Sequence, residues 1–201
     1  MQAGQPTIEF WFEFGSTYSY LSVMRIEALA AVREVTLHYK PFLLGPIFKT
    51  LGFKNSPFNE QKAKGEYMWR DLERQCQLHG LAWKKPSEFP RLTVLPMRVA
   101  LLGAEQPWMG AFCREVMLAA FARDEDISGE PAVRAILERL DLPADELLAE
   151  AQSEANKLRL REQTERASQL GIFGAPMFFA GGEMFWGNDR LEQALDWAKR
   201  S

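Results

Sequence analysis

Two short segments of the chain carry residues whose types and spacing could do chemistry. The first, Gly15-Ser16-Thr17-Tyr18, follows an apolar run and begins a helical pattern, so Ser16 stands at a predicted helix N-terminus. A hydroxyl there can donate a hydrogen bond to an anion, and the free N–H groups and the helix macrodipole favour the same negative charge. The alternative is that Ser16 is only an N-cap residue.

A thiolate supplied by a bound cofactor is one anion that this arrangement would suit. A free thiol has a pKa of about 8.5, so little of it is ionised at neutral pH. Lowering that pKa by ~2 requires about 2.7 kcal/mol. One charge-assisted hydrogen bond of ~1.5–3 kcal/mol and a helix-terminus contribution of ~0.3–1 kcal/mol would supply it.

The second segment is Ala175-Pro176, which follows Gly174 and opens a later strand pattern. Its X-Pro bond is a candidate for a cis peptide. The main-chain N–H and C=O of Ala175 would then stay unpaired and could bind an extended cysteinyl backbone by strand addition. The alternative is an ordinary proline that begins a strand.

The cysteines and histidines exclude several other chemistries. Cys76 and Cys113 are the two cysteines, and they form no C-x-x-C pair, so dithiol–disulfide exchange and a disulfide framework are both excluded. Both lie in predicted helices, where we expect them to be small core residues. His38 and His79 are isolated, so we expect no histidine-based metal site.

The elements around the two segments predict how they are positioned. Bulky and alternating residues predict strands over 7–14 and 35–42 with a helix over 16–32 between them, a βαβ unit with parallel strands. Apolar runs on either side of Gly181-Gly182 predict a β-hairpin over 177–180 and 183–186. A last helix over 188–199 follows, with Asp189 and Glu192 spaced as a capping box.

Between these halves the apolar spacing predicts an all-helical block from about residue 45 to 169. Breaks at prolines, glycines and an Asn-Ser-Pro segment divide it into helices over 60–79, 96–106, 108–123, 130–140, 144–150 and 153–170. The whole order predicts an α/β thioredoxin-like fold (βαβ…ββα) with a large all-helical insertion. We expect residues 1–44 and 171–201 to form a discontinuous thioredoxin-like domain, and residues 45–170 a helical insertion domain.

Composition limits the class of protein further. The 201 residues are 47% hydrophobic and 12% aromatic, which is enough for a sizeable core. A formal net charge of −3 argues against a nucleic-acid partner. No apolar run is long enough to cross a membrane, and the first six residues lack the features of a signal peptide. We therefore expect a soluble, cytoplasmic protein.

Further segments occur in an order and at separations typical of one family. They are residues 12–21 (FEFGSTYSYL), 40–45 (KPFLLG), 55–57 (NSP), 64–68 (KGEYM), 70–72 (RDL), 171–176 (GIFGAP) and 185–190 (FWGNDR). Through them the chain resembles the 2-hydroxychromene-2-carboxylate isomerases, glutathione-dependent relatives of the kappa-class glutathione transferases in the DsbA-like thioredoxin superfamily. The resemblance implies a DsbA or kappa type of fold, glutathione as the cofactor and a homodimer.

The resemblance also implies roles at the two segments described first. Ser16 matches the catalytic serine that hydrogen-bonds the glutathione sulfur. Ala175, with Pro176, would pair with the cysteinyl main chain of the cofactor. Thr17 stands where the family usually has a proline, which would pre-set the backbone of the first helical turn. This departure either loosens the turn or adds a second hydroxyl.

Four more positions are implied to bind glutathione. Asn55 would contact the glycyl end, Lys64 a carboxylate, and Asn188 with Asp189 the γ-glutamyl end. Each position has a plainer alternative, which is a turn residue for Asn55, a solvated surface side chain for Lys64, and helix capping for Asn188 and Asp189.

The activity implied by the resemblance is an isomerisation. A glutathione thiolate adds reversibly to 2-hydroxychromene-2-carboxylate or its opened form, permits rotation about a former double bond, and leaves to give trans-o-hydroxybenzylidenepyruvate. Tyr18, Phe42, Trp83 or Trp186 would suit a pocket for such a small aromatic substrate, or each could be a core residue. The alternatives are a kappa-like transferase that releases a stable conjugate, and a non-catalytic binding module in which Ser16 is only a cap.

Overall fold

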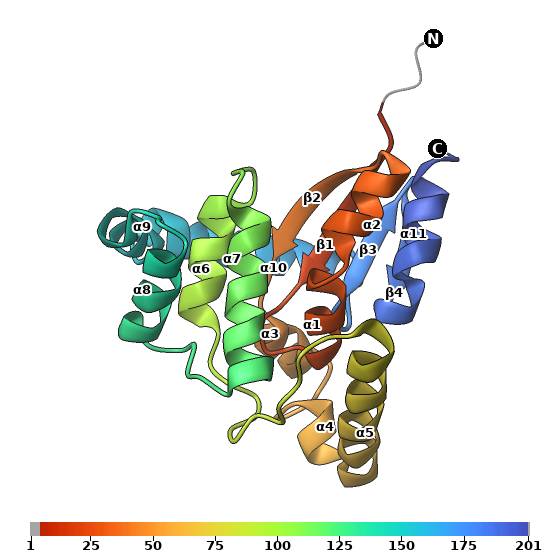
Figure 1. The fold of residues 1–201 in the computed structure, drawn as a ribbon, viewed down its shortest axis with the longest axis horizontal. Coiled ribbons are helices and arrows are strands. Elements are labelled where there is room, and N and C mark those ends of the chain that lie inside the picture. The colour runs from red at the N-terminus through yellow and green to blue at the C-terminus, as the bar shows by residue number, and fades with distance from the viewer. Residues whose placement is uncertain (1–4, 201) are drawn as a thin grey trace.

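The computed structural model describes residues 5–200 (Figure 1). Residues 1–4, which belong to the segment without signal-peptide features, and residue 201 lie outside the described residues. The strands are β1 (Thr7–Phe12), β2 (Thr36–Pro41), β3 (Met177–Ala180) and β4 (Glu183–Trp186). The α-helices are α1 (Thr17–Val23), α2 (Ile26–Arg33), α3 (Leu44–Thr50), α4 (Pro57–Glu60), α5 (Lys62–His79), α6 (Val94–Gly103), α7 (Met109–Leu118), α8 (Glu130–Arg139), α9 (Ala144–Ala151), α10 (Glu154–Gln169) and α11 (Leu191–Ala198).

The four strands form one mixed sheet in the order β2-β1-β3-β4. Strand β1 runs parallel to β2, while β3 is antiparallel to both β1 and β4. Gly181 and Gly182, both with positive φ (56° and 81°), make the tight turn between β3 and β4. This arrangement confirms the DsbA-like thioredoxin fold and the predicted hairpin.

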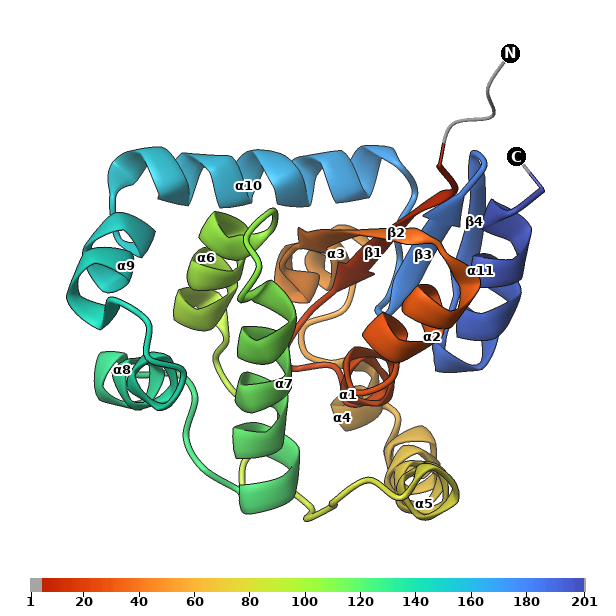
Figure 2. The same ribbon diagram turned by 45° about the horizontal axis from the view of Figure 1, so that its top comes forward.

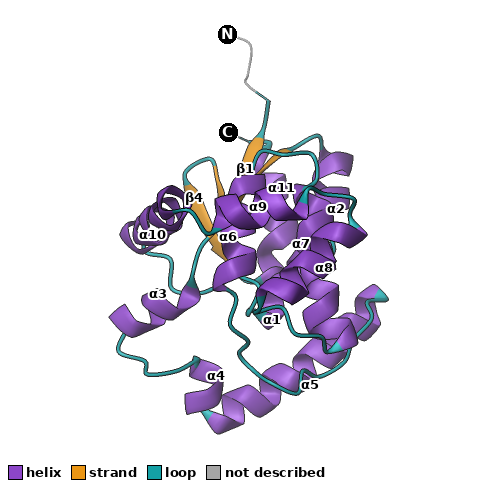
Figure 3. Cartoon of the chain, turned by 90° about the vertical axis from the view of Figure 1, so that its left-hand side faces the viewer, coloured by secondary structure: helices purple, strands orange, loops and turns teal. Residues whose placement is uncertain are grey.

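Alternation along β1 sends side chains to two separate cores. Phe10 and Phe12 belong to the larger core, which is covered by α1, α2, α7 and α11. Trp11 points the other way, into a smaller core with Phe42 and Met177, beneath α3 and α10. The sheet is therefore covered on both faces, as Figure 3 shows with α10 and α3 on one side of the strands and α2 and α11 on the other.

The helical block lies beside the sheet and returns to it along one long helix. Helices α6 to α9 gather at one end of the molecule, and α4 and α5 form a pair next to α1 (Figure 1). Helix α10 then runs from the α9 end back to the sheet (Figure 2). Helices α3, α6 and α10 pack directly against elements of the sheet half or against each other. The boundary between the two predicted domains therefore stays a prediction. Among the described residues, no helix has the length and apolar character needed to span a bilayer.

Several predicted boundaries change in the structure. The single helix predicted over 16–32 is two helices, because the chain turns at Met24 and Arg25. The guanidinium of Arg25 reaches Asn188 and Glu192 at that turn, so a contact distant in sequence accompanies the break. Helix α3 lies within the predicted helical block but was not separately predicted, because its Gly45-Pro46 pair is typical of a turn.

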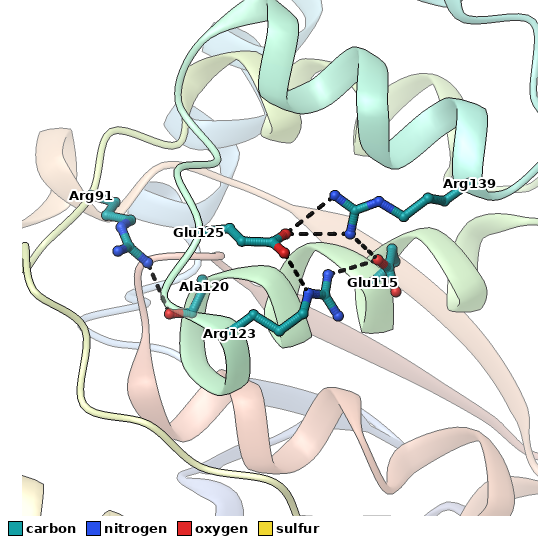
Figure 4. Close-up of polar contacts among 6 residues, drawn as sticks. All are labelled: Arg91, Glu115, Ala120, Arg123, Glu125 and Arg139. Carbon is teal, nitrogen blue, oxygen red and sulfur yellow. Dashed lines mark hydrogen bonds and ion pairs between the residues drawn. The ribbon is translucent and has the colours of Figure 1, made fainter.

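The helix predicted over 108–123 ends differently from its prediction. After α7 the chain continues as a π-helical turn, Ala119–Arg123. Arg123 and Arg139 each pair with both Glu115 and Glu125, so two basic and two acidic side chains join α7, the π turn and α8 (Figure 4). This network fixes the end of α7 and the π-helical turn that follows it.

The capping box predicted at the last helix is wrong. Asn188–Arg190 form a 3₁₀ turn, and α11 begins after Arg190 without a side-chain cap. The carboxylate of Glu192 is paired with Arg25 instead of folding back over the helix start. Asp189 therefore does not cap α11, and its side chain is 73% exposed.

Candidate active site

Ser16 lies between the end of β1 and the start of α1, with its hydroxyl in two hydrogen bonds. Its Oγ accepts from the backbone N–H of Ser19 at 3.1 Å and donates to the carbonyl oxygen of Ala175 at 2.8 Å. The first bond makes Ser16 the N-cap of α1. The second bond joins the two segments that the sequence singled out, although they are 159 residues apart.

The Ala175-Pro176 peptide bond is cis, in agreement with the candidate cis bond. The expectation that both main-chain groups of Ala175 stay unpaired holds only for its N–H, which has no partner among the described residues. The carbonyl is taken by Ser16 because the serine hydroxyl needs an acceptor in a site where it is only 9% exposed. Pro176 is buried and accepts from the N–H of Gly187 at 3.0 Å.

A pocket of about 710 Å³ is lined by Gly15, the residue before Ser16, whereas Ser16, Ala175 and Pro176 are not part of its wall. Its wall on the sheet side consists of Glu13 and Gly15. The remaining walls come from α3, from the loop that follows it, and from the segment that leads into α6, and they include Gly45, Pro46, Phe48, Lys49, Phe53, Lys54, Asn55, Ser56, Arg91, Leu92 and Thr93. The pocket therefore combines apolar walls with several cationic groups.

Glu13 is a buried acid at this pocket that the sequence analysis did not single out. It is 6% exposed, and its Oε2 accepts from the N–H of Gly15 at 2.9 Å while its Oε1 accepts from the hydroxyl of Thr93. Burial raises the pKa of Glu13 to about 7, and these two hydrogen bonds act in the opposite direction. The sequence signal that could have identified Glu13 is an acidic residue inside an otherwise aromatic run, FWFEF.

The segment that carries Thr93 is anchored from behind. Arg91 donates to the carbonyl oxygen of Ala120 at 2.8 Å (Figure 4) and also pairs with Asp124. A backbone N–H of Ser87 donates to the same carboxylate at 2.8 Å, and these contacts lower the pKa of Asp124 to about 2. The guanidinium of Arg91 is thus paired within the protein. Lys49 and Lys54 are the pocket cations that have no ion pair among residues 5–200.

Asn55 and Lys64 are placed differently with respect to the pocket. Asn55 lines it, and its Oδ1 accepts from the N–H of Ser56 at 2.7 Å, so it also fulfils the turn role. Lys64 is an exposed residue of α5 whose ammonium lies 5.7 Å from the centre of the Phe58 ring. It is not part of the pocket wall.

Asn188 and Asp189 follow Gly187, whose N–H donates to the carbonyl oxygen of Pro176, and neither lines the pocket. The Oδ1 of Asn188 accepts from Ser22 at 3.1 Å and from Arg25 at 3.3 Å, so this buried side chain ties the 3₁₀ turn to α1. The carboxylate of Asp189 is exposed, 3.6 Å from the guanidinium of Arg190.

The aromatic residues proposed for a substrate pocket do not line this one. Phe42 is fully buried in the smaller core, and Trp83 stacks on Trp69. Tyr18 donates to Asp71 on α5 at 3.0 Å, and Trp186 packs edge-on against Phe173. The aromatic walls are Phe48 and Phe53, which sequence reasoning missed because they lie on α3 and in the loop after it.

The two cysteines and Thr17 are buried side chains outside the pocket wall. Cys76 and Cys113 are buried in α5 and α7, as predicted. Thr17 is also buried at the first position of α1, and its hydroxyl has no hydrogen-bond partner among the described residues. Within residues 5–200 there is no cluster of three side chains suited to a metal ion.

The chain therefore has a thioredoxin-like fold in which Ser16, and not a C-x-x-C pair, lies opposite a cis-proline. The chain matches the DSBA-like thioredoxin domain over residues 7–197, and it belongs to that family. Within the family it groups with the 2-hydroxychromene-2-carboxylate isomerases and the kappa-class glutathione transferases, which confirms the resemblance seen in the sequence.

The similarity to these relatives extends over most of each chain. The protein is 30% identical to 2-hydroxychromene-2-carboxylate isomerase of Sphingobium xenophagum, covering 92% of this chain and 94% of the relative. It is 29% identical to glutathione S-transferase kappa 1 of Rattus norvegicus, covering 92% and 87%. A solved structure of 2-hydroxychromene-2-carboxylate isomerase superposes with a TM-score of 0.86 at 26% identity, covering 96% and 95%.

Proposed function

We propose that this protein is a glutathione-dependent isomerase that interconverts 2-hydroxychromene-2-carboxylate and trans-o-hydroxybenzylidenepyruvate, or acts on a related aromatic substrate. The observation that carries this proposal is the hydroxyl of Ser16, which donates to the Ala175 carbonyl at 2.8 Å beside the cis-proline and directly follows the pocket-lining Gly15. The relatives named above support the same reaction class.

The residues around the pocket fit a peptide-like thiol. A volume of about 710 Å³ lies within the range of ~300–1,000 Å³ usual for ligand sites. Lys49 and Lys54 line it without an ion pair in the part of the chain that the structure describes, so they can meet carboxylates of the cofactor or of the substrate. Asn55 offers an amide on the same wall. When bound, glutathione supplies a thiolate that can add to a conjugated carbon and leave again.

Ser16 would stabilise that thiolate by exchanging one hydrogen-bond partner for another. A hydroxyl has one proton, so Ser16 can donate to the sulfur only by releasing the Ala175 carbonyl. The released carbonyl and the free N–H of Ala175 are then both available to a cysteinyl main chain. The N–H of Ser19 continues to donate to Oγ, which strengthens Ser16 as a donor. Helix α1 has only seven residues. The hydrogen bond from Ser16 should therefore contribute more to stabilising the thiolate than the helix macrodipole does.

The outer contacts of the cofactor complete the proposal. Asp189 would face the γ-glutamyl ammonium, with Asn188 holding its turn against α1. Asn55 would contact the glycyl end, and Lys64 would act from the rim, outside the pocket wall. A homodimer and a cytoplasmic location also remain predictions, and light scattering of the purified protein measures the first.

The experiment is equilibrium binding of reduced glutathione, followed by ultraviolet titration of the bound thiol and analysis of the products. We expect saturable binding, a bound thiol with a pKa below its free value, and an isomerised substrate with glutathione unchanged. The 29% identity to a kappa-class transferase favours one competing outcome, in which glutathione is consumed and a conjugate of higher mass forms. A folded protein that does not bind glutathione would instead be a binding module.

A further inference from the structure

Glu13 is a pocket residue to which the proposed function gives no task. Its carboxyl group follows the buried strand β1 and lines the same wall as Gly15, directly before Ser16. The backbone N–H of Ser16 donates to the carbonyl oxygen of Glu13 at 3.1 Å, so the two residues close one turn. Glu13 has no ion-pair partner among residues 5–200, which is unusual for a buried acid.

The protein holds this carboxyl group in place from two directions. Thr93 occupies the N-cap position of α6, yet its hydroxyl makes no cap and donates to Glu13 instead. On the other side, Gly15 donates its N–H to Oε2. A side chain at position 15 would place its Cβ 2.8 Å from that oxygen, so glycine leaves the room that the carboxyl group occupies.

Glu13 can change protonation state near neutral pH although cations share its pocket. Lys49 of α3, Lys54 of the following loop and Arg91 of the segment before α6 share its pocket, and Arg91 is bound to Asp124. Burial nevertheless dominates and raises the pKa of Glu13 to about 7, close to the range where a proton acceptor works best.

We propose that Glu13 is the proton acceptor of this site, whose carboxylate takes the thiol proton of bound glutathione directly or through one water molecule. The S–H bond breaks, an O–H bond forms on Glu13, and the electron pair stays on sulfur; the proton returns when the cofactor is released. This inference rests on the proposed function. It also removes a conflict, because a carboxylate and a thiolate in one pocket repel each other, whereas one shared proton leaves a single negative charge.

The test counts the protons released when glutathione binds. At a pH of about 8, free Glu13 is mostly ionised and a free thiol of pKa ~8.5 is mostly protonated. Transfer from sulfur to Glu13 then releases almost no proton to the buffer. In Glu13→Gln the same ionisation must release most of one proton. Titration calorimetry in two buffers of different ionisation enthalpy measures this number, while ultraviolet absorbance confirms the thiolate in both proteins.

S-methylglutathione is the matched control, because it has no thiol proton to transfer. We expect the two proteins to differ by most of one proton with glutathione and not to differ with S-methylglutathione. Equal proton release with glutathione, with thiolate formed in both, overturns the role of Glu13 and leaves the proposed function intact. Absence of binding or of thiolate in the native protein overturns both.

Thr93→Val provides a second variant that keeps the acid. In the native protein, proton release should fall as the pH rises through the pKa of Glu13, because an ionised Glu13 begins to accept the thiol proton. Removing the hydrogen bond from Thr93 raises that pKa further, so the fall should move to higher pH. An unchanged profile in Thr93→Val contradicts the proposal even if Glu13→Gln fails to fold.

Discussion

The two sides of the pocket are built in contrasting ways. On the sheet side, Glu13 of the pocket wall and the neighbouring Ser16 and Ala175 are buried or half-buried, and each is held by hydrogen bonds within the protein. On the insertion side, Lys49 and Lys54 are exposed and make no ion pair within residues 5–200. The groups proposed to act on the thiol are thus fixed in advance of binding, whereas the groups that would recognise charge stay solvated until a ligand arrives.

Thr93 is the exception that connects the two sides. It belongs to the insertion, yet its buried hydroxyl contacts Glu13 on the sheet side. The helical insertion therefore shapes the pocket and also influences the pKa of Glu13, the acid beside Ser16. The following predictions test this contrast in order of decreasing effect.

Ser16→Ala should produce the largest loss of activity. Removing one preorganised donor to a developing anion typically lowers turnover by about 10²- to 10³-fold. Ser153→Ala is a matched control, since Ser153 caps α10 through the N–H of Asn156 in the same way, far along the chain from the pocket. Both variants should lose about 1 kcal/mol of stability, measured by denaturation. Equal turnover in the two variants would leave Ser16 with a capping role alone.

Glu13 should make the native protein less stable as the pH rises. Its pKa is higher in the folded protein than in the unfolded chain, so the folded state binds the proton more tightly. The resulting stabilisation is complete below the ordinary carboxyl pKa of about 4.5 and is lost as the pH approaches about 7. Between pH ~5 and ~8 the free energy of unfolding should fall by about 2 kcal/mol from this group.

Glu13→Gln separates that contribution from all others. Glutamine resembles the protonated acid, because its oxygen can accept from Gly15 and its amide can donate to the Thr93 oxygen. Denaturant unfolding at several pH values should therefore give a flatter profile in the variant than in the native protein. Parallel profiles would show that Glu13 titrates alike in the folded and unfolded chains.

The lysines on the insertion side should have the smallest effects. Lys49→Ala and Lys54→Ala should each weaken glutathione or substrate binding by about five-fold, roughly 1 kcal/mol, and less at high salt. Lys64→Ala should change affinity less than two-fold, because Lys64 lies outside the pocket wall. Calorimetric titration at two salt concentrations measures all three. A larger loss at Lys64 would mean that α5 moves toward the bound ligand.

The sequence predicted the sheet side better than the insertion side. Its strands lie between strong local signals, such as Gly181-Gly182, and the hairpin strands have the predicted bounds. Ser16 was identified because a serine at a strand–helix junction is a local pattern. Its partner Ala175 was identified from the predicted fold. The structure confirms that the two segments meet.

The features that were missed depend on contacts between distant residues. Glu13 stands out in the sequence only as an acid in an aromatic run, whereas its burial and its contact with Thr93, 80 residues away, depend on the folded chain. The break between α1 and α2 contains no proline or glycine, and Arg25 forms contacts there with the far end of the chain. Local periodicity contains no information on such pairs, so the acid, the break and the aromatic pocket walls emerged only from the structure.

The burial of both thiols makes the protein a convenient background for site-directed labelling. Burial raises the pKa of Cys76 to about 11 and places that of Cys113 well above its ordinary value, so neither offers the exposed thiolate that maleimides and iodoacetamides attack. A single cysteine introduced by Lys54→Cys would therefore carry a fluorophore or spin label at one defined place. Such a probe would follow the mouth of the pocket in real time without any prior removal of native cysteines.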